Sequence, residues 1–361
     1  RDGFSNCFSK FISQEKGRVV FLGGSITSNG GWRDETMRYL KMCFPKTKFE
    51  FIAAGIPSVG STGHAFRMER DVLSGGPVDL IFVEAAVNDS TNIPDNPELM
   101  LRGMEGVIRR IVETNPFCDI VQLHFAMPMH IDDYSNKRVP VSIAQHERVA
   151  EHYKCNSLNL SLEVHDRIEA GEFGWESDFR DLHPSPYGQR VYANSIARML
   201  DIGRHALSVE PVVHVLPEEM LDTASYFKGR FGPLENAKII TGFTLNPRWN
   251  PSDGKECRAG FVNVPALVAS SAGAEFCYEW EGTAFGLFLA AGPKTGIIEF
   301  SIDGGKFKKM DTWTRWSGSL HLPWPVILAD GLEDGKHEAV IRTATSADNR
   351  NSLNVIHILL N

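Results

Sequence analysis

Short apolar runs alternate with longer amphipathic stretches from Gly17 to about Leu200. Four runs rich in β-branched and aromatic residues predict buried strands, at Arg18–Leu22, Phe49–Ala53, Val78–Glu84 and Ile120–Phe125. Apolar residues recur at helical spacing in the intervening and following stretches, at Trp32–Cys43, Ala65–Leu73, Glu98–Glu113, Ile143–Tyr153 and Pro186–Leu200. This alternation predicts βαβ units on a parallel sheet.

The pattern changes beyond Ile202. Residues 206–250 combine prolines with mixed short elements, as linkers do, and from about Gly260 short alternating strands are separated by Gly/Asp turns. The clearest of these strands are Ala284–Leu289, Gly296–Ile302 and His337–Thr343. We therefore predict an α/β domain over 1–205, a connecting segment over 206–250, and an all-β sandwich or jelly roll over 251–361.

Composition narrows the class of protein. The chain has 361 residues, of which 42% are hydrophobic and 23% charged, so it is neither disordered nor fibrous. Its formal charge of −8 and the absence of a basic stripe argue against a nucleic-acid partner. No apolar run approaches the ~18–20 residues that a membrane span needs. The six cysteines form no C-x-x-C pair and no zinc-like cluster with histidine, so most are expected to be small buried side chains, and one disulfide stays open.

Three polar positions carry the candidate chemistry, and the first is a serine that follows a predicted strand. The strand Arg18–Leu22 runs into Gly23, Gly24 and Ser25. Ligands of open α/β folds bind at the carboxyl edge of the sheet, where the Ser25 hydroxyl would lie. The backbone N–H of Ser25 could also face a developing oxyanion. This turn contains neither a Gly-Lys-Ser/Thr nor a G-x-G-x-x-G motif, so phosphate binding is not expected. Ser25 is then interpreted either as part of a structural turn or as a nucleophile.

The second position is Asn88, which follows the strand Val78–Glu84. Its side-chain amide is a donor of the kind that stabilises an oxyanion, although Asn-Asp pairs also open turns. The glycine-rich loop 54–63 would end beside the same edge, so a glycine N–H there is a further candidate donor. Glu84 and Asp89 flank Asn88 and allow a weaker interpretation as a glycosidase carboxylate pair.

The third position is His183, in the segment Asp178–Pro184. An imidazole is well suited to accept a proton from a serine hydroxyl near neutral pH, and a nearby carboxylate can hold its second ring nitrogen. A histidine before proline is otherwise an ordinary turn residue. The coincidence of Ser, Asn and His at one predicted sheet edge favours a catalytic site.

These segments resemble the sequence blocks of the SGNH, or GDSL-type, hydrolases. Gly-Gly-Ser-Ile-Thr resembles the first block, with Gly24 where Asp is commoner; Ala-Val-Asn-Asp resembles the Gly-x-Asn-Asp block; and Asp-Leu-His-Pro resembles the Asp-x-x-His-Pro block. The resemblance spans residues 19 to about 200. It implies a flavodoxin-like three-layer α/β/α domain and ester hydrolysis through an acyl-enzyme, with no metal or organic cofactor.

The resemblance also implies roles for individual residues. Ser25 is the expected nucleophile, His183 the general base, and Asn88 an oxyanion donor together with the backbone N–H of Ser25. For the second-block donor we expect Gly60, although the family register falls on Ser58. The usual position of the acid, three residues before the histidine, holds Arg180. The expected orienting residue is therefore Asp181, with Asp178 as the alternative.

The leading hypothesis is a serine esterase that removes small acyl groups, with acetyl as the expected group, from a carbohydrate. The β-rich part holds five of the seven tryptophans, which suit either core packing or stacking on sugar rings. Two alternatives remain open: a lipase or thioesterase with the same machinery, and a catalytically silent glycan-binding protein. The chain begins at Arg1 without a signal-peptide pattern, and a secreted or periplasmic location is expected.

Overall fold

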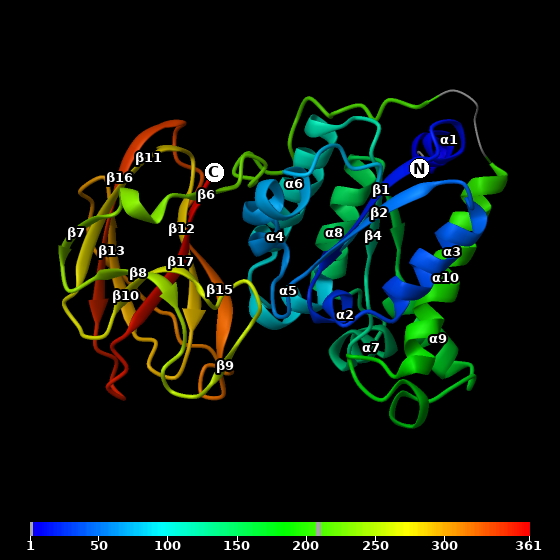
Figure 1. The fold of residues 1–361 in the computed structure, drawn as a ribbon. Helices are drawn as coiled ribbons and strands as arrows, with labels where there is room; N and C mark the ends of the chain where they lie inside the picture. Colours follow the sequence, from blue (N-terminus) through cyan, green and yellow to red (C-terminus); the bar gives the residue numbers. More distant parts are fainter. Residues whose placement is uncertain (1–2, 207–210) are drawn as a thin grey trace. The chain divides into compact units, whose positions relative to one another are not determined.

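Five parallel strands form the sheet of the N-terminal part, in the order β2-β1-β3-β4-β5 (Figure 1). This is the strand order of a flavodoxin-like doubly wound fold, which confirms the predicted fold class. The strands are β1 (Lys16–Gly23), β2 (Lys48–Gly55), β3 (Leu80–Glu84), β4 (Asp119–Leu123) and β5 (Asn156–Leu158). The prediction lacks β5, because three half-buried residues provide no apolar run.

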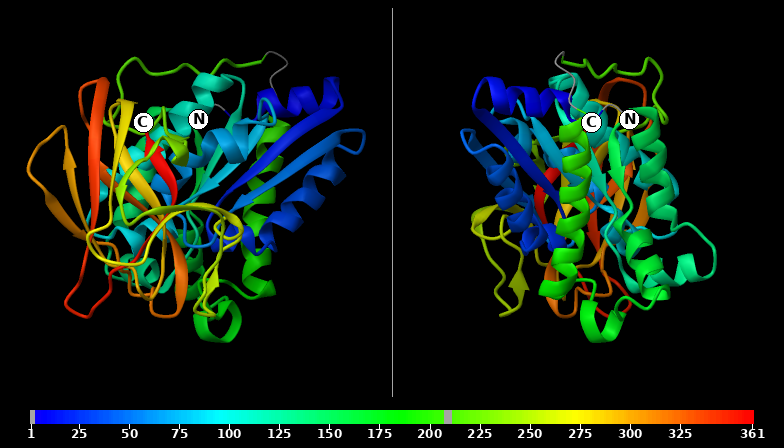
Figure 2. Two further views of the ribbon diagram at one scale, coloured as in Figure 1. Left: turned by 60° about the vertical axis from the view of Figure 1, so that its left-hand side comes forward. Right: turned by 90° about the vertical axis from the view of Figure 1, so that its right-hand side faces the viewer.

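Helices cover both faces of this sheet and complete the three layers (Figures 1 and 2). On one face α4, α6 and α8 pack together, and on the other α3 packs against α10. The helices are α1 (Ser5–Ser13), α2 (Ser25–Ser28), α3 (Trp32–Cys43), α4 (Ser61–Met68), α5 (Ala86–Asn92), α6 (Pro97–Thr114), α7 (Pro128–Ser135), α8 (Val141–His152), α9 (Leu160–Glu169) and α10 (Pro186–His205). Short π-helical turns lie at Glu69–Leu73 and Trp175–Phe179.

Aromatic side chains fill the layer between the sheet and α3. Phe21 of β1 stacks on Phe82 of β3 with a centroid distance of 5.3 Å, and Trp32 meets Phe125 edge-on at 5.3 Å. All four side chains are buried, and each such pair adds roughly 0.5–1.5 kcal/mol beyond the burial of its area. This packing holds β1 beside β3, so the segments that follow these two strands begin at the same edge.

The C-terminal part is built from antiparallel sheets. One sheet has the order β8-β10-β17-β12-β15-β9, with β6 paired to β17, and the other has the order β14-β13-β16-β11-β7. The β9–β15 pair is the parallel exception. The strands are β6 (Arg230–Gly232), β7 (Lys238–Thr241), β8 (Thr244–Trp249), β9 (Glu256–Cys257), β10 (Val264–Ala269), β11 (Glu275–Gly282), β12 (Phe285–Ala291), β13 (Ile297–Ile302), β14 (Lys308–Asp311), β15 (Leu320–Ala329), β16 (Gly335–Ala344) and β17 (Leu353–Leu360).

The boundary between the two compact units differs from the expected linker over 206–250. The first unit ends at Phe227 and the second spans Lys228–Asn361, so β6, β7 and β8 belong to the second unit. These strands are short and mostly exposed, which hides them from a hydrophobic pattern. The structure describes residues 3–206 and 211–361, and positions 207–210 of the expected linker lie outside the described residues.

Candidate active site

Ser25 lies at the carboxyl edge of the parallel sheet. β1 ends at Gly23, and α2 begins at Ser25 itself, so the backbone N–H of Ser25 has no acceptor within that helix. The Ser25 hydroxyl Oγ is 2.7 Å from Nε2 of His183, although the two residues are 158 positions apart. This hydrogen bond joins a nucleophile candidate to a base candidate in the geometry that proton transfer needs.

The two candidate acids differ in position. Oδ2 of Asp181 is 3.9 Å from Nδ1 of His183, and Oδ1 accepts from the backbone N–H of Leu182 at 2.5 Å. Asp178 instead accepts from the N–H of Gly174 at 2.8 Å and from Oγ of Ser177 at 2.6 Å, and these hydrogen bonds lower the pKa of its carboxyl. Of the two carboxylates, Asp181 is therefore the one beside the histidine.

A left-handed residue shapes the turn that carries Asp181. Arg180 follows the π-helical turn and has φ +79° and ψ −51°, a conformation that costs a non-glycine residue of order 1–3 kcal/mol. Its backbone N–H donates to the carbonyl of Trp175 at 2.5 Å, which closes the π-helical turn. Asp181 and His183 follow this turn within three residues.

Asn88 packs directly against the glycine that precedes the nucleophile. It lies in the first turn of α5, after β3, and its Oδ1 occupies the space that a Cβ on Gly24 would need. Gly24 has φ −86°, which any residue can adopt, so this close approach rather than the backbone conformation is what requires glycine. The structure thus brings Asn88 to the Ser25 turn, as the sequence predicts.

The second-block candidates lie just before α4. Gly60 is the residue that precedes this helix, and Oδ1 of Asp89 occupies the space of a Cβ at Gly60. Ser58 has φ +72°, and its carbonyl accepts from Nδ2 of Asn92 at 2.9 Å. Both residues therefore contact the α5 segment, and Gly60 is the one held against the residue that follows Asn88.

Glu84, which the sequence allows as one half of a glycosidase carboxylate pair, is a buried carboxyl. It ends β3, is 2% exposed, and its Oε1 accepts from the backbone N–H of Val87 at 3.1 Å. Burial raises the pKa of this carboxyl to about 7, with a further contribution from the negative charge of Asp89, while hydrogen bonds from Val87 and Gly24 act in the opposite direction. Glu84 and Asp89 are both sealed from solvent, which excludes them as carboxylates flanking a sugar.

Sequence reasoning missed a second buried polar group, the His146 imidazole that contacts Asp89. His146 of α8 is fully buried, and its Nε2 is 2.9 Å from Oδ2 of Asp89. His64 is buried too, with Nε2 3.2 Å from the carbonyl of Glu84 and Nδ1 accepting from Nε of Arg67 at 3.2 Å. Burial and the charge of Arg67 lower the pKa of His64 well below its usual value. A histidine in a helix gives no sequence signal of such a contact.

The cysteines and the metal-ligating residue types form no further site in the described part of the chain. All six cysteines are free thiols, and burial raises the pKa of Cys7 and Cys118. No group of three or more His, Cys, Asp or Glu side chains is arranged to hold a metal ion within residues 3–206 and 211–361. None of the helices described is both long and apolar enough to span a bilayer.

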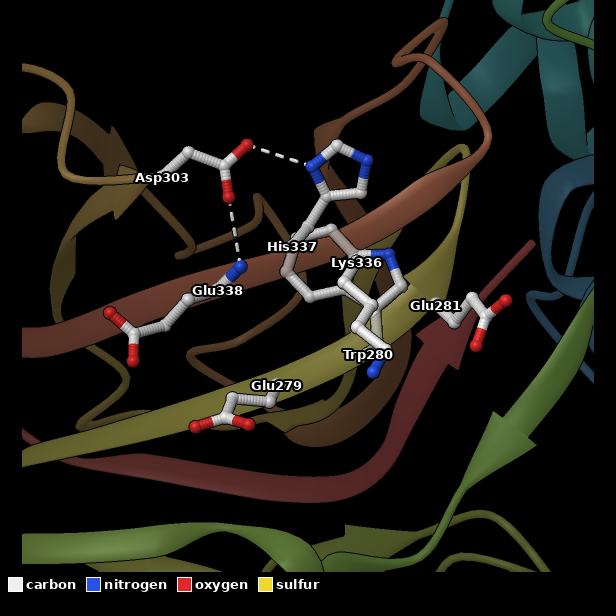
Figure 3. A pocket seen from close by; sticks show the side chains of 7 residues that line it. All are labelled: Glu279, Trp280, Glu281, Asp303, Lys336, His337 and Glu338. Carbon is white, nitrogen blue, oxygen red and sulfur yellow. Dashed lines mark hydrogen bonds and ion pairs between the residues drawn. The ribbon is translucent and has the colours of Figure 1, made fainter.

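The second unit has a surface cavity of about 540 Å³ on β11 and β16 (Figure 3). Asp303 accepts there from Nδ1 of His337 at 2.7 Å and from the N–H of Glu338 at 2.9 Å, and the His337 ring lies 5.3 Å from that of Trp280. The pair with Asp303 raises the pKa of His337. None of the motif residues contributes to this cavity, so it lies outside the candidate active site.

Comparison with known proteins identifies the first unit. Residues 21–191 match the model of the GDSL-like lipase/acylhydrolase family. This segment belongs to that family. The matched region contains Ser25, Asn88 and His183, and it assigns the first unit to the esterases of the GDSL type.

Two crystal structures resemble the chain over both units. They are of a two-domain esterase active on acetylated mannans, in one case co-crystallised with mannopentaose. Sequence identity is 20% in both, with TM-scores of 0.78 and 0.79, and the likeness covers 99% of this chain and 95% of the other. At this identity the likeness shows a shared fold. None of the curated proteins matches the chain.

Proposed function

We propose that this GDSL-type esterase hydrolyses O-acetyl esters of a carbohydrate through an acyl-enzyme on Ser25. The observation that carries the proposal is the 2.7 Å hydrogen bond between Ser25 Oγ and His183 Nε2 at the carboxyl edge of the sheet. His183 is the general base, and Asp181 is the carboxylate that orients it. No metal or organic cofactor takes part.

Acylation and deacylation use the same two side chains. Ser25 Oγ attacks the acetyl carbonyl carbon while His183 Nε2 takes the hydroxyl proton. The bond between the carbonyl carbon and the sugar oxygen breaks, and His183 returns the proton to that oxygen. Water, deprotonated by His183, then attacks the acetyl-Ser25 ester, releases acetate and restores the Ser25 hydroxyl.

The negative charge of each tetrahedral intermediate needs preorganised donors. We assign this role to the backbone N–H groups of Ser25 and Gly60 and to the side-chain amide of Asn88. Support comes from the contacts of Asn88 with Gly24 and of Asp89 with Gly60, which bring all three donors to adjoining segments. Loss of one donor from an oxyanion hole of this kind costs about 10²–10³ in kcat.

The proposed substrate, a small acyl group on a glycan, is supported by solved structures that share this fold. The two-domain esterase with the same fold acts on acetylated mannans. We accordingly propose an acetylated polysaccharide as substrate and a site of action outside the cytoplasm, where such polymers occur.

A glycan-binding protein without turnover is the second candidate. It is favoured by the 3.9 Å separation and the 63% exposure of the Asp181 side chain, which leave His183 weakly supported.

The deciding experiment compares the parent protein with Ser25→Ala. Acetate release is measured from acetylated mannan, acetylated xylan and a chromogenic acetate ester. We expect release by the parent and none by the variant. A parent that releases no acetate from any ester, yet binds the polysaccharides equally well as Ser25→Ala, would establish the binding protein instead.

A further inference from the structure

We propose that His146, acting through Asp89, is a positioning residue for the oxyanion site of this esterase. The inference rests on the roles proposed above for Asn88 and Gly60. It concerns a side chain of α8 that lies outside all three motifs and that the reaction itself does not use.

The Asp89 carboxylate joins three segments of the first unit. Its Oδ1 accepts from the backbone N–H of Ser61 at 2.9 Å and packs against Gly60, 29 positions before Asp89 in the sequence. Its Oδ2 is 2.9 Å from Nε2 of His146, 57 positions later. The carboxylate is 1% exposed and the imidazole 0%, so water does not compete for either oxygen.

Both proposed donors are adjacent to groups that this carboxylate holds. Gly60 precedes Ser61, whose N–H the carboxylate binds, and Asn88 precedes Asp89 itself. A shift of the Asp89 side chain therefore changes the distance between the Gly60 N–H and the Asn88 amide. Because stabilisation of an oxyanion depends on donors held in place before the reaction, such a shift lowers kcat.

His146 is what holds the second carboxylate oxygen. Without its N–H, Oδ2 would be an unpaired acceptor in a dry interior, a state that costs about 1–3 kcal/mol and drives the carboxylate to rotate or to admit water. Nδ1 of His146 has no hydrogen-bond partner among the described residues. The hydrogen bonding of this ring is thus directed to Asp89.

The chain offers a matched control in His124. This histidine is also fully buried, and its Nε2 is 2.8 Å from Oε1 of Glu147, so it forms the same kind of pair. Its ring centre lies 6.0 Å from that of His146. The Glu147 side chain is 31% exposed and lies on α8. Unlike Asp89, Glu147 is not adjacent in sequence to Gly60 or Asn88.

The experiment compares His146→Met, His146→Gln and His124→Met with the parent, using the chromogenic acetate ester. Met and Gln have similar length, but only Gln keeps an N–H donor for Asp89. We expect His146→Met to lower kcat about ten-fold or more with KM nearly unchanged, since a misplaced catalytic group costs rate rather than affinity. His146→Gln should recover most of kcat, and His124→Met should leave it within about two-fold. The same His146→Met change in an Asn88→Ala background should cost less than in the parent, because one of the two donors is already absent.

Each outcome has a definite meaning. Equal losses from His146→Met and His124→Met, or an equal His146→Met loss with and without Asn88, would assign His146 a general structural role and overturn the inference. If thermal unfolding shows that His146→Met does not fold, His146→Gln decides: kcat near the parent value supports the proposal, and a loss above ten-fold contradicts it. A parent with no acetate release, indistinguishable from Ser25→Ala, refutes the proposed function, whereas an active parent matched by His146→Met refutes this inference alone.

Discussion

Oδ2 of Asp181 lies 3.9 Å from Nδ1 of His183, beyond the length of a hydrogen bond. The Asp181 side chain is 63% exposed and that of His183 41%. Ion pairs this exposed are screened by solvent and contribute little. Support of the histidine by its carboxylate is therefore weak in this esterase, and the proton transfer depends mainly on the Ser25–His183 contact.

Asp181→Asn is accordingly expected to be a mild variant. We predict a loss in kcat of less than about ten-fold, against about 10⁴ where a triad aspartate is buried and hydrogen-bonded to its histidine. The kinetics of the chromogenic ester provide the measurement. Asp178→Asn is the control and should retain parent kcat, since Asp178 binds Gly174 and Ser177 instead. A larger loss from Asp178→Asn than from Asp181→Asn would reverse the assignment of the acid.

Asn88→Ala tests the proposed oxyanion donor. We expect kcat to fall by about 10²–10³ while KM changes little, because the amide acts on charge that develops only in the transition state. Steady-state kinetics of the purified variant, with circular dichroism to confirm the fold, would measure this. Turnover equal to that of the parent would remove Asn88 from the mechanism.

Gly24→Ala tests the close approach of Asn88 to the nucleophile turn. A Cβ at Gly24 overlaps Oδ1 of Asn88, so the amide has to move away from the Gly24 turn. We predict a kcat loss that approaches that of Asn88→Ala. The double variant should be little worse than Asn88→Ala alone, because both changes remove the same donor. Losses that multiply in the double variant would show that Gly24 acts independently of Asn88.

Glu84 predicts a pH dependence of stability. Its pKa is about 7 in the folded protein against 4.5 for an ordinary glutamic acid, so between these values the folded chain keeps a proton that the unfolded chain has lost. The stability contributed by this group is complete below pH 4.5 and is lost as the pH rises through 7, a change of roughly 3 kcal/mol. Asp89 shares this environment, and the carbonyl of Glu84 faces His64.

Glu84→Gln removes this titration. The free energy of unfolding of the variant, minus that of the parent, should rise between about pH 4.5 and pH 8 when both are measured by urea denaturation. Glu105→Gln is the matched control. Glu105 lies on α6, is as buried as Glu84, and accepts hydrogen bonds from the backbone N–H groups of Leu221 and Asp222. Parallel curves for parent and Glu84→Gln would contradict the raised pKa.

The local sequence was sufficient to predict the features of this esterase that depend on the periodicity of hydrophobic residues. Alternation of β-branched runs with helical ones predicted the parallel sheet, and the turns after β1 and β3 predicted that Ser25 and Asn88 meet at one edge. That inference holds because parallel strands end on the same side of a sheet. The family match over residues 21–191 then agrees with the resemblance carried by the motifs.

The sequence by itself thus determined the fold class and the family, and tertiary structure decided which side chains touch. The choice between Asp178 and Asp181 depends on a π-helical turn and on the left-handed Arg180, which no spacing rule specifies. The Asp89–His146 contact joins residues 57 positions apart, and β6 to β8 gain their place only by pairing with other strands. Hydrophobic periodicity indicates which face of a single helix or strand is buried. A hydrogen bond between two elements depends instead on the distance between them, which is determined only when the chain is packed.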